Sequence, residues 1–185
     1  MAFIQVIVGS TRPSRSSRKV ADWFLAQAQV PAGSTIEIID LVDVNLPLLD
    51  EPKSAMLNQY SKDHTKEWAK IVSKADGYVW VTPEYNHSTS AALKNAIDYL
   101  YKEWTYKPVA FVGYGGMGAT RAIEHLVNVA SELSMFPLKP RYHVLDVWSA
   151  FNEDGSIKPE LIRGDASAVL AELVKVAEAT KDLRE

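Results

Sequence analysis

The chain has 185 residues, which suits one domain with one sizeable core, and its 47% hydrophobic and 23% charged residues are typical of a globular protein. A formal net charge of -3 gives no basic field for nucleic acid or an anionic membrane, and no apolar run approaches the roughly 20 residues that span a bilayer. The sequence has no cysteine, which excludes disulfides, thiol redox chemistry and cysteine-ligated metal centres. We expect a single cytoplasmic domain over residues 1–185, which would need a cofactor for any redox reaction.

Strands and helices are expected to alternate along the whole chain. The amino terminus lacks the features of a signal peptide and is expected to form the first strand. The helices are indicated by apolar residues spaced at i, i+3, i+4 and i+7, and the strands by short runs rich in Val and Ile. In chain order we predict strand 3–8, helix 15–29, strand 35–40, a helix around 68–75, strand 77–82, helix 88–104, strand 108–113, helix 118–133, strand 142–147 and helix 159–181.

Five strands separated by helices predict an α/β fold, with a parallel sheet covered on both faces. Two strand orders are common for such a chain, the flavodoxin-like order 2-1-3-4-5 and a Rossmann arrangement. In both, ligands bind outside the carboxyl ends of the strands. The loops after the first, third and fourth strands are therefore the places to look for a site.

The loop after the first strand is rich in hydroxyl groups and arginine. Residues 9–18, GSTRPSRSSR, contain five Ser or Thr and three Arg before a helix begins. Hydroxyls, guanidinium groups and a helix N-terminus are the donors that a phosphate requires. The plainer alternative is a Ser-rich helix cap with solvated arginines.

This loop lacks both the dinucleotide fingerprint G-x-G-x-x-G and the P-loop pattern. The absence favours a single terminal phosphate, such as that of FMN, over a pyrophosphate. The candidate phosphate ligands are Ser10, Arg12, Ser16 and Ser17. Three other side chains of this loop could point to solvent instead, namely those of Thr11, Arg15 and Arg18.

The loop after the third strand begins with a proline that should make it stiff. Pro83 fixes its own φ and pushes Thr82 towards an extended conformation, so the backbone can be presented to a planar heterocycle. The candidate cofactor-binding residues of this loop are Pro83, Glu84, Tyr85, Asn86 and Ser88. In alternative interpretations Pro83 is only a stiff turn and Glu84 is a solvated carboxylate or contacts the ring through its backbone. His87 is expected to be a surface histidine.

Here the sequence resembles a known family. The string TPEYNHSTSAALKNAIDYL resembles the signature P-E-Y-N-x-S-x-x-x-x-L-K-N-A-I-D of the NADPH-dependent FMN reductases, and residues 9–13 resemble their G-S-x-R phosphate loop. The resemblance covers the whole chain. It implies a flavodoxin-like three-layer αβα sandwich with a five-stranded parallel sheet in the order 2-1-3-4-5. It also implies non-covalent FMN, NADPH or NADH as co-substrate, and a homodimer or tetramer with contacts around helix 88–104.

The loop after the fourth strand holds four glycines within residues 113–118, a concentration that is conformationally costly. Such a loop is expected where backbone approaches a ligand closely, and in the family it borders the isoalloxazine ring. The candidates are Tyr114, Gly115 and Gly116, with the alternative of a flexible turn. Many relatives have serine in place of Tyr114, whose ring could stack near the flavin.

The resemblance implies an oxidoreductase that passes hydride from NAD(P)H to FMN N5 and then two electrons to an acceptor, by ping-pong kinetics. The acceptor could be a flavin, quinone, azo compound or metal oxyanion. The alternatives are an electron carrier or a regulatory flavoprotein without turnover. No nucleophile elbow and no metal-ligand spacing of histidines is present, so we expect neither a serine hydrolase nor a metal site. Because FMN N5 would carry the hydride, we expect no catalytic side chain. The open site is expected to be walled by Trp104, Tyr106 and residues 46–60, although Trp104 could equally belong to the core.

Overall fold

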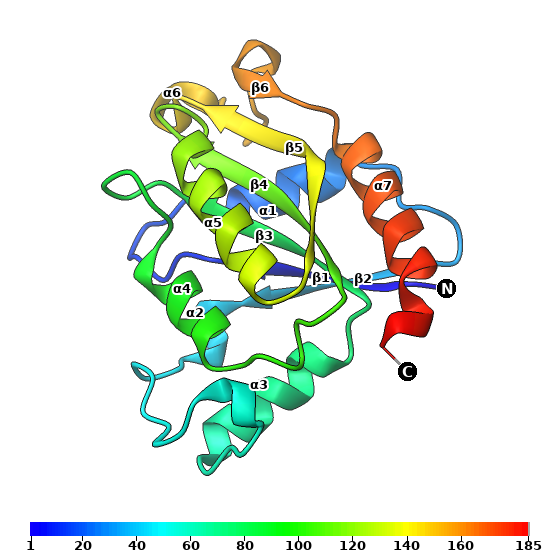
Figure 1. Cartoon of the computed structure of the whole chain (residues 1–185). Helices are drawn as coiled ribbons and strands as arrows, with labels where there is room; N and C mark the ends of the chain where they lie inside the picture. Colours follow the sequence, from blue (N-terminus) through cyan, green and yellow to red (C-terminus); the bar gives the residue numbers. More distant parts are fainter. Residues whose placement is uncertain (185) are drawn as a thin grey trace.

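A six-stranded sheet forms the centre of the molecule, with strands in the order β2-β1-β3-β4-β5-β6 (Figure 1). The computed structural model describes residues 1–184. The strands are β1 Phe3–Val8, β2 Thr35–Asp40, β3 Gly77–Pro83, β4 Pro108–Gly115, β5 Phe136–Leu145 and β6 Ile162–Arg163. The first five pair in parallel and follow the expected order 2-1-3-4-5.

The expectation of only five strands is wrong, because β6 pairs antiparallel with β5 at the edge of the sheet. It is two residues long, too short to leave a periodic signal, and it lies within the stretch expected to begin the last helix. Gly164 follows it with φ +100°, and a Cβ there would lie 2.1 Å from the carbonyl oxygen of Arg141. This close approach of two backbones requires glycine.

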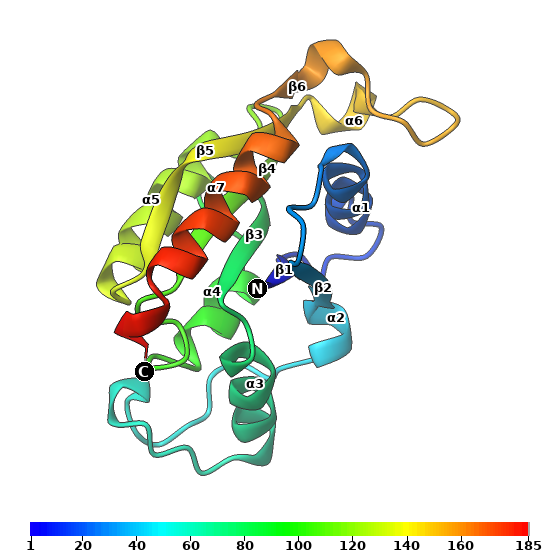
Figure 2. The same cartoon turned by 90° about the vertical axis from the view of Figure 1, so that its right-hand side faces the viewer.

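The central strands are apolar because both of their faces are covered. Every residue of β3, and all of β4 except Gly115, is buried, whereas β2 at the edge is half exposed. The α-helices are α1 Ser17–Gln27, α2 Leu41–Val44, α3 Asp63–Ser73, α4 Ala91–Asp98, α5 Thr120–Glu132, α6 Val147–Ala150 and α7 Ala166–Ala179. Helices α1 and α7 contribute to one apolar core and α3, α4 and α5 to the other; Figure 2 shows α1 and α5 on opposite sides of the sheet.

Several helix and strand ends differ from the expected ones because side chains cap or interrupt the local pattern. Helix α4 begins at Ala91, since Ser90 caps it by accepting a hydrogen bond from Leu93 N at 3.1 Å, and it ends at Asp98 instead of 104. Helix α7 begins at Ala166 rather than 159, after the cap Asp165. Strand β5 begins at Phe136 rather than 142, because two prolines hide its strand pattern.

Two residues expected to wall the site lie elsewhere. Trp104 is fully buried and packs edge-on against Trp80 and Tyr78, at centroid distances of 5.8 and 4.8 Å. The alternative that Trp104 belongs to the core is therefore confirmed. Tyr106 precedes β4, at the amino ends of the strands, so it faces away from the loops. Within residues 1–184 no helix has the length and apolar character to cross a membrane.

Candidate functional site

The loops after β1, β3 and β4 meet at the carboxyl ends of these strands and enclose a pocket of about 180 Å³. The pocket also receives residues from the start of α6. Eight of the twelve predicted site residues line it, namely Arg12, Ser16, Pro83, Glu84, Tyr85, Tyr114, Gly115 and Gly116. The predicted residues outside its lining are Ser10, Ser17, Asn86 and Ser88.

Ser10 joins the first loop to the second. Gly9 N donates to Val81 O at 2.9 Å, and a Cβ at Gly9 would lie 2.5 Å from that oxygen, so glycine lets the end of β1 run against β3. Ser10 is then fully buried, with its Oγ 2.9 Å from the hydroxyl of Tyr85. The Tyr85 phenol therefore links the two loops.

Three buried polar atoms around the pocket have no hydrogen-bond partner within the described part of the chain: Ser17 Oγ, Tyr114 OH and Arg15 Nε. Burial raises the pKa of Tyr114 to about 12, and the hydroxyls of Ser17 and Ser10 lie close enough to oppose this rise without completing a bond. Tyr114 is consequently a neutral donor near pH 7. Buried donors without acceptors are unfavourable, and an anionic ligand would satisfy them.

The three arginines of the first loop differ in their surroundings. The expectation that Arg15 points to solvent is wrong: its Nη2 lies 2.6 Å from Asp40 Oδ2, and its side chain is 21% exposed. Asp40 ends β2, so this ion pair exists only because β2 lies beside β1. Arg18 is half exposed and pairs with Asp22 along α1, whereas Arg12 is exposed and lines the pocket.

The loop after β3 folds back into a tight turn. Tyr85 and Ser88 exchange backbone hydrogen bonds of 2.9 and 3.1 Å, with Asn86 and His87 at φ +49° and +76° between them. The Tyr85 amide is thus already used within the turn and is not available to a ligand. Asn86 and His87 are exposed at the tip, as expected for His87, and Ser88 Oγ lies 3.0 Å from His125 Nδ1.

Glu84 caps helix α5, so the alternative that it is a solvated carboxylate is wrong. Its oxygens accept from the amides of Arg121 and Ala122 at 3.0 and 3.3 Å, and from Arg121 Nε at 2.6 Å. The side chain is only 7% exposed. Burial opposes ionisation, but the hydrogen bonds from Arg121 and Ala122 prevail and lower the pKa of Glu84. The contact holds the loop after β3 against the start of α5.

Replacing Glu84 with glutamine is expected to lower the free energy of unfolding by about 1 kcal/mol at pH 7, the usual contribution of a helix cap. Because the folded-state pKa is lowered, the stabilisation is present above the unfolded pKa of about 4.3 and is lost as the pH falls below it. Urea unfolding at pH 7 and pH 3 measures both values. Glu172→Gln is the control, since its contact with Lys175 spans 4.0 Å on the exposed side of α7. A deficit of Glu84→Gln that persists unchanged at pH 3 would contradict this account.

The glycine-rich loop after β4 depends on glycine at two points. A Cβ at Gly113 would lie 2.2 Å from the carbonyl oxygen of Gly118, and Gly115 has φ +146°. The loop therefore turns back tightly over the end of β4. The turn explains these glycines, and the close approach of backbone to a ligand stays a prediction.

Trp148 is a lining residue that the sequence analysis missed. It belongs to α6, three residues after the end of β5, and it is 80% exposed. A Cβ at Gly116 would lie 3.4 Å from Cζ3 of its indole. The signal that could have found it is a large aromatic residue just past the carboxyl end of a parallel strand.

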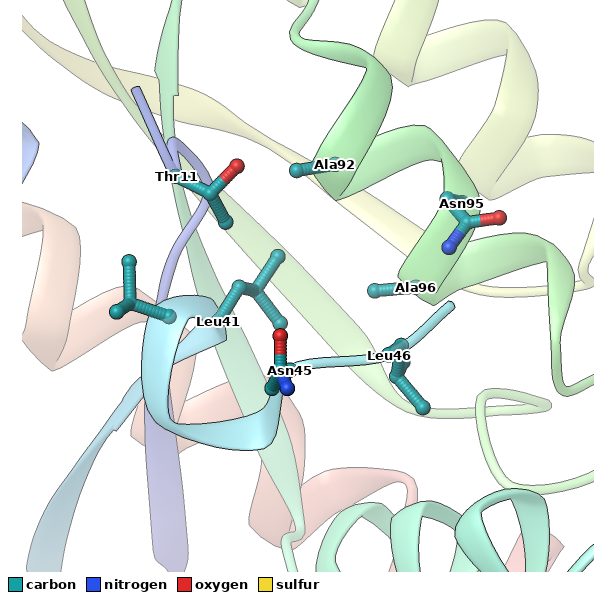
Figure 3. Close-up of a pocket in the computed structure, with 8 residues that line it drawn as sticks. Thr11, Leu41, Asn45, Leu46, Ala92, Asn95 and Ala96 are labelled. Carbon is teal, nitrogen blue, oxygen red and sulfur yellow. The ribbon is translucent and has the colours of Figure 1, made fainter. Parts of the chain in front are cut away.

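A second pocket of about 240 Å³ is formed by the first loop, α2 and α4 (Figure 3). Thr11 is exposed and lines it, together with Leu46 from the segment expected to wall the site. Asn95 fixes this segment: its Nδ2 donates to Pro47 O at 2.7 Å and its Oδ1 accepts from Leu49 N at 2.9 Å. Asn95 therefore holds this segment against α4. Among the residues described, no three His, Asp or Glu side chains gather in a way that could hold a metal.

The profile of the family described as NADPH-dependent FMN reductase matches residues 3–149. An NAD(P)H-dependent FMN reductase, ntnL, of Nectria sp is 35% identical over 99% of this chain and 97% of its own length. The NAD(P)H-dependent FMN reductase C4B3.06c of Schizosaccharomyces pombe is 40% identical over 71% of this chain and 67% of its own length.

Among solved structures, the chain resembles FerB, a flavoenzyme NAD(P)H:(acceptor) oxidoreductase from Paracoccus denitrificans. The TM-score is 0.67 at 23% sequence identity, and the match covers 100% of this chain and 97% of FerB. At this level of identity the likeness concerns the fold. It supports a flavodoxin-like α/β architecture for the six-stranded sheet.

Proposed function

Because this chain belongs to the family of NADPH-dependent FMN reductases, we propose that its single domain, residues 1–185, binds FMN in the pocket formed by the loops after β1, β3 and β4. The chain is an NAD(P)H-dependent FMN oxidoreductase. The chemistry that FMN supplies when bound is two-electron transfer from NAD(P)H to a second substrate. The role of the protein is to bind and orient the reactants and to stabilise charge.

The phosphate of FMN is assigned to the loop after β1. The observation that carries this assignment is the pair of buried, unpartnered hydroxyls of Ser17 and Tyr114. Ser16 caps α1 without using its side chain, which leaves the first amides of the helix open to an anion. Arg12 adds a positive charge beside them. The proposed phosphate ligands are Ser10, Arg12, Ser16, Ser17 and Tyr114.

The isoalloxazine ring is proposed to lie against the loops after β3 and β4. Pro83 and Glu84 from the first of these loops, and Gly115 and Gly116 from the second, line the pocket. Glu84 acts through its position, because its carboxylate is committed to α5. Asn86 and Ser88 are proposed to reach the ring from the rim of the site. Backbone donors near the polar edge of a flavin would stabilise the negative charge that builds up on reduction.

The acceptor is proposed to be a small molecule, and a flavin, quinone, azo compound or metal oxyanion would fit the open pocket. We also propose a cytoplasmic homodimer or tetramer in contact around α4. The segment that Asn95 ties to α4 carries exposed apolar side chains, including Leu48 at 81% and Met56 at 65% exposure. Such a surface is typical of one that a partner subunit covers.

The purified protein is expected to bind FMN at micromolar concentrations and to oxidise NADPH or NADH in steady state with a quinone as acceptor. Double-reciprocal plots at several acceptor concentrations should be parallel, since both substrates use the same site in turn. Intersecting plots would contradict the exchange scheme. Binding of FMN without turnover would favour the alternative of an electron carrier or regulatory flavoprotein, and absence of binding would overturn the proposed site.

A further inference from the structure

Trp148 is unusual among the tryptophans of this chain. Trp68, Trp80 and Trp104 are at most 1% exposed, and Trp23 is half-buried, whereas Trp148 is 80% exposed. A tryptophan side chain carries a large apolar area, and leaving it in water forgoes the free energy of burial. A ligand that binds in the neighbouring pocket and covers the indole would therefore gain this free energy.

The backbone that carries Trp148 is held in place. The neighbouring side chains of Val147 and Ala150 are buried in the core. Lys158 ties α6 from the other side, because its Nζ donates to Ser149 O at 2.7 Å and its amide to Ala150 O at 2.9 Å. The exposure of the indole consequently does not come from a loose segment. The fold holds this one side chain out into solvent.

The indole lies against the glycine-rich loop. A Cβ at Gly116 would lie 3.4 and 3.6 Å from Cζ3 and Cη2 of Trp148, at the tight end of van der Waals contact. The ring thus lies within van der Waals reach of the backbone that borders the pocket. Tyr85 and Tyr114, from the other two loops, line the same pocket.

The residues that line the pocket offer two kinds of contact to a ligand. Arg12, Ser16 and the unpartnered hydroxyl of Tyr114 offer donors to an anion, whereas the indole offers an apolar face and no positive charge. A ligand that matches both needs a phosphate and a planar heterocycle. The indole suits the heterocycle, since aromatic rings attract one another when stacked or edge-on.

We infer that Trp148 is the outer wall of the flavin site, contacts the flavin rather than the phosphate of FMN, and slows the release of FMN between turnovers. This inference rests on the proposed FMN site. The wall is supplied by α6, a part of the chain that none of the three predicted loops includes. It determines how firmly FMN stays bound during turnover.

The test is equilibrium and stopped-flow binding of FMN and of riboflavin to the wild-type protein and to Trp148→Ala. We expect the variant to bind both ligands about 5- to 10-fold more weakly, because their release rates rise by this factor. This is the effect of losing about one aromatic contact. Trp148→Phe should recover most of the affinity. Tyr106→Ala is the matched control, because it removes an exposed aromatic side chain at the opposite end of the sheet.

Thermal unfolding without ligand should be the same for Trp148→Ala and wild type, since the side chain is exposed. Wild-type affinity and release rate in Trp148→Ala would overturn the inference and leave the proposed function intact. A loss for FMN alone, with riboflavin unaffected, would also overturn it, because the indole would then act at the phosphate. Failure of the wild-type protein to bind FMN would overturn the proposed function itself.

Discussion

Replacing both Arg12 and Ser17 with alanine is expected to weaken FMN binding at least about 100-fold while riboflavin binding changes less than about threefold. Each replaced side chain offers a hydrogen bond to a charged group, which contributes roughly 1.5–3 kcal/mol. Riboflavin lacks the phosphate and so loses neither contact. Isothermal titration with the two ligands measures the difference directly.

The double variant should fold, because neither side chain supports the core. Arg12 is exposed, and the buried Ser17 hydroxyl has no partner within residues 1–184, so its removal deletes an unsatisfied group. The melting temperature without ligand should therefore be unchanged or slightly raised. Arg18→Ala is the matched control, since Arg18 lies next to Ser17 but pairs with Asp22 in solvent. Equal losses for FMN and riboflavin would show that this loop is not the phosphate site.

Gly113→Ala is expected to lower the free energy of unfolding by about 3 kcal/mol and to abolish FMN binding. The new Cβ would lie 2.2 Å from the backbone oxygen of Gly118, which cannot rotate away as a side chain could. The loop that carries Gly115 and Gly116 must then leave its position. Overpacking of this kind costs roughly 1–3 kcal/mol, and more where backbone has to shift.

Gly155→Ala is the control for Gly113→Ala, because it also adds a methyl group but produces no clash. Gly155 has φ +83°, but a Cβ there would meet nothing within 4 Å. Its replacement should cost only the roughly 1–2 kcal/mol of a left-handed alanine and leave FMN binding unchanged. Urea unfolding and FMN titration of both variants make the comparison. Equal stability of the two variants would rule out the steric role of Gly113.

The Arg12 and Ser17 substitutions and the Gly113 substitution should affect FMN binding for different reasons. In the proposed site Arg12 and Ser17 contact only the phosphate, so their removal is expected to change ligand choice more than stability. Gly113 supplies the path of the backbone, so its replacement changes both together. Glu84, like Gly113, acts on the path of the backbone. Its carboxylate holds the loop after β3 against helix α5, which follows the loop after β4.

Much of the architecture was predictable from the sequence because the signals are local. Apolar runs and helical spacing located the first two strands at Phe3–Val8 and Thr35–Asp40 as the structure has them. The alternation of strands and helices predicted a parallel sheet but left two strand orders open, and the resemblance to the FMN reductases implied the observed order of the first five strands. The switch-point rule indicated the three loops. The serines, arginines and glycines of these loops are visible in the sequence whatever their partners are.

The tertiary structure decided which of these side chains are free to meet a ligand. Arg15 pairs with Asp40, Tyr85 with Ser10 and Glu84 with Arg121, across separations of 25, 75 and 37 residues. Such partners depend on which strands are neighbours, and no local pattern contains that information. Trp148 was missed because it follows β5, whose carboxyl end was not among the three predicted loops; the pairing of β4 with β5 brings it to Gly116. Local periodicity thus determined the strands and loops, and long-range packing determined the site.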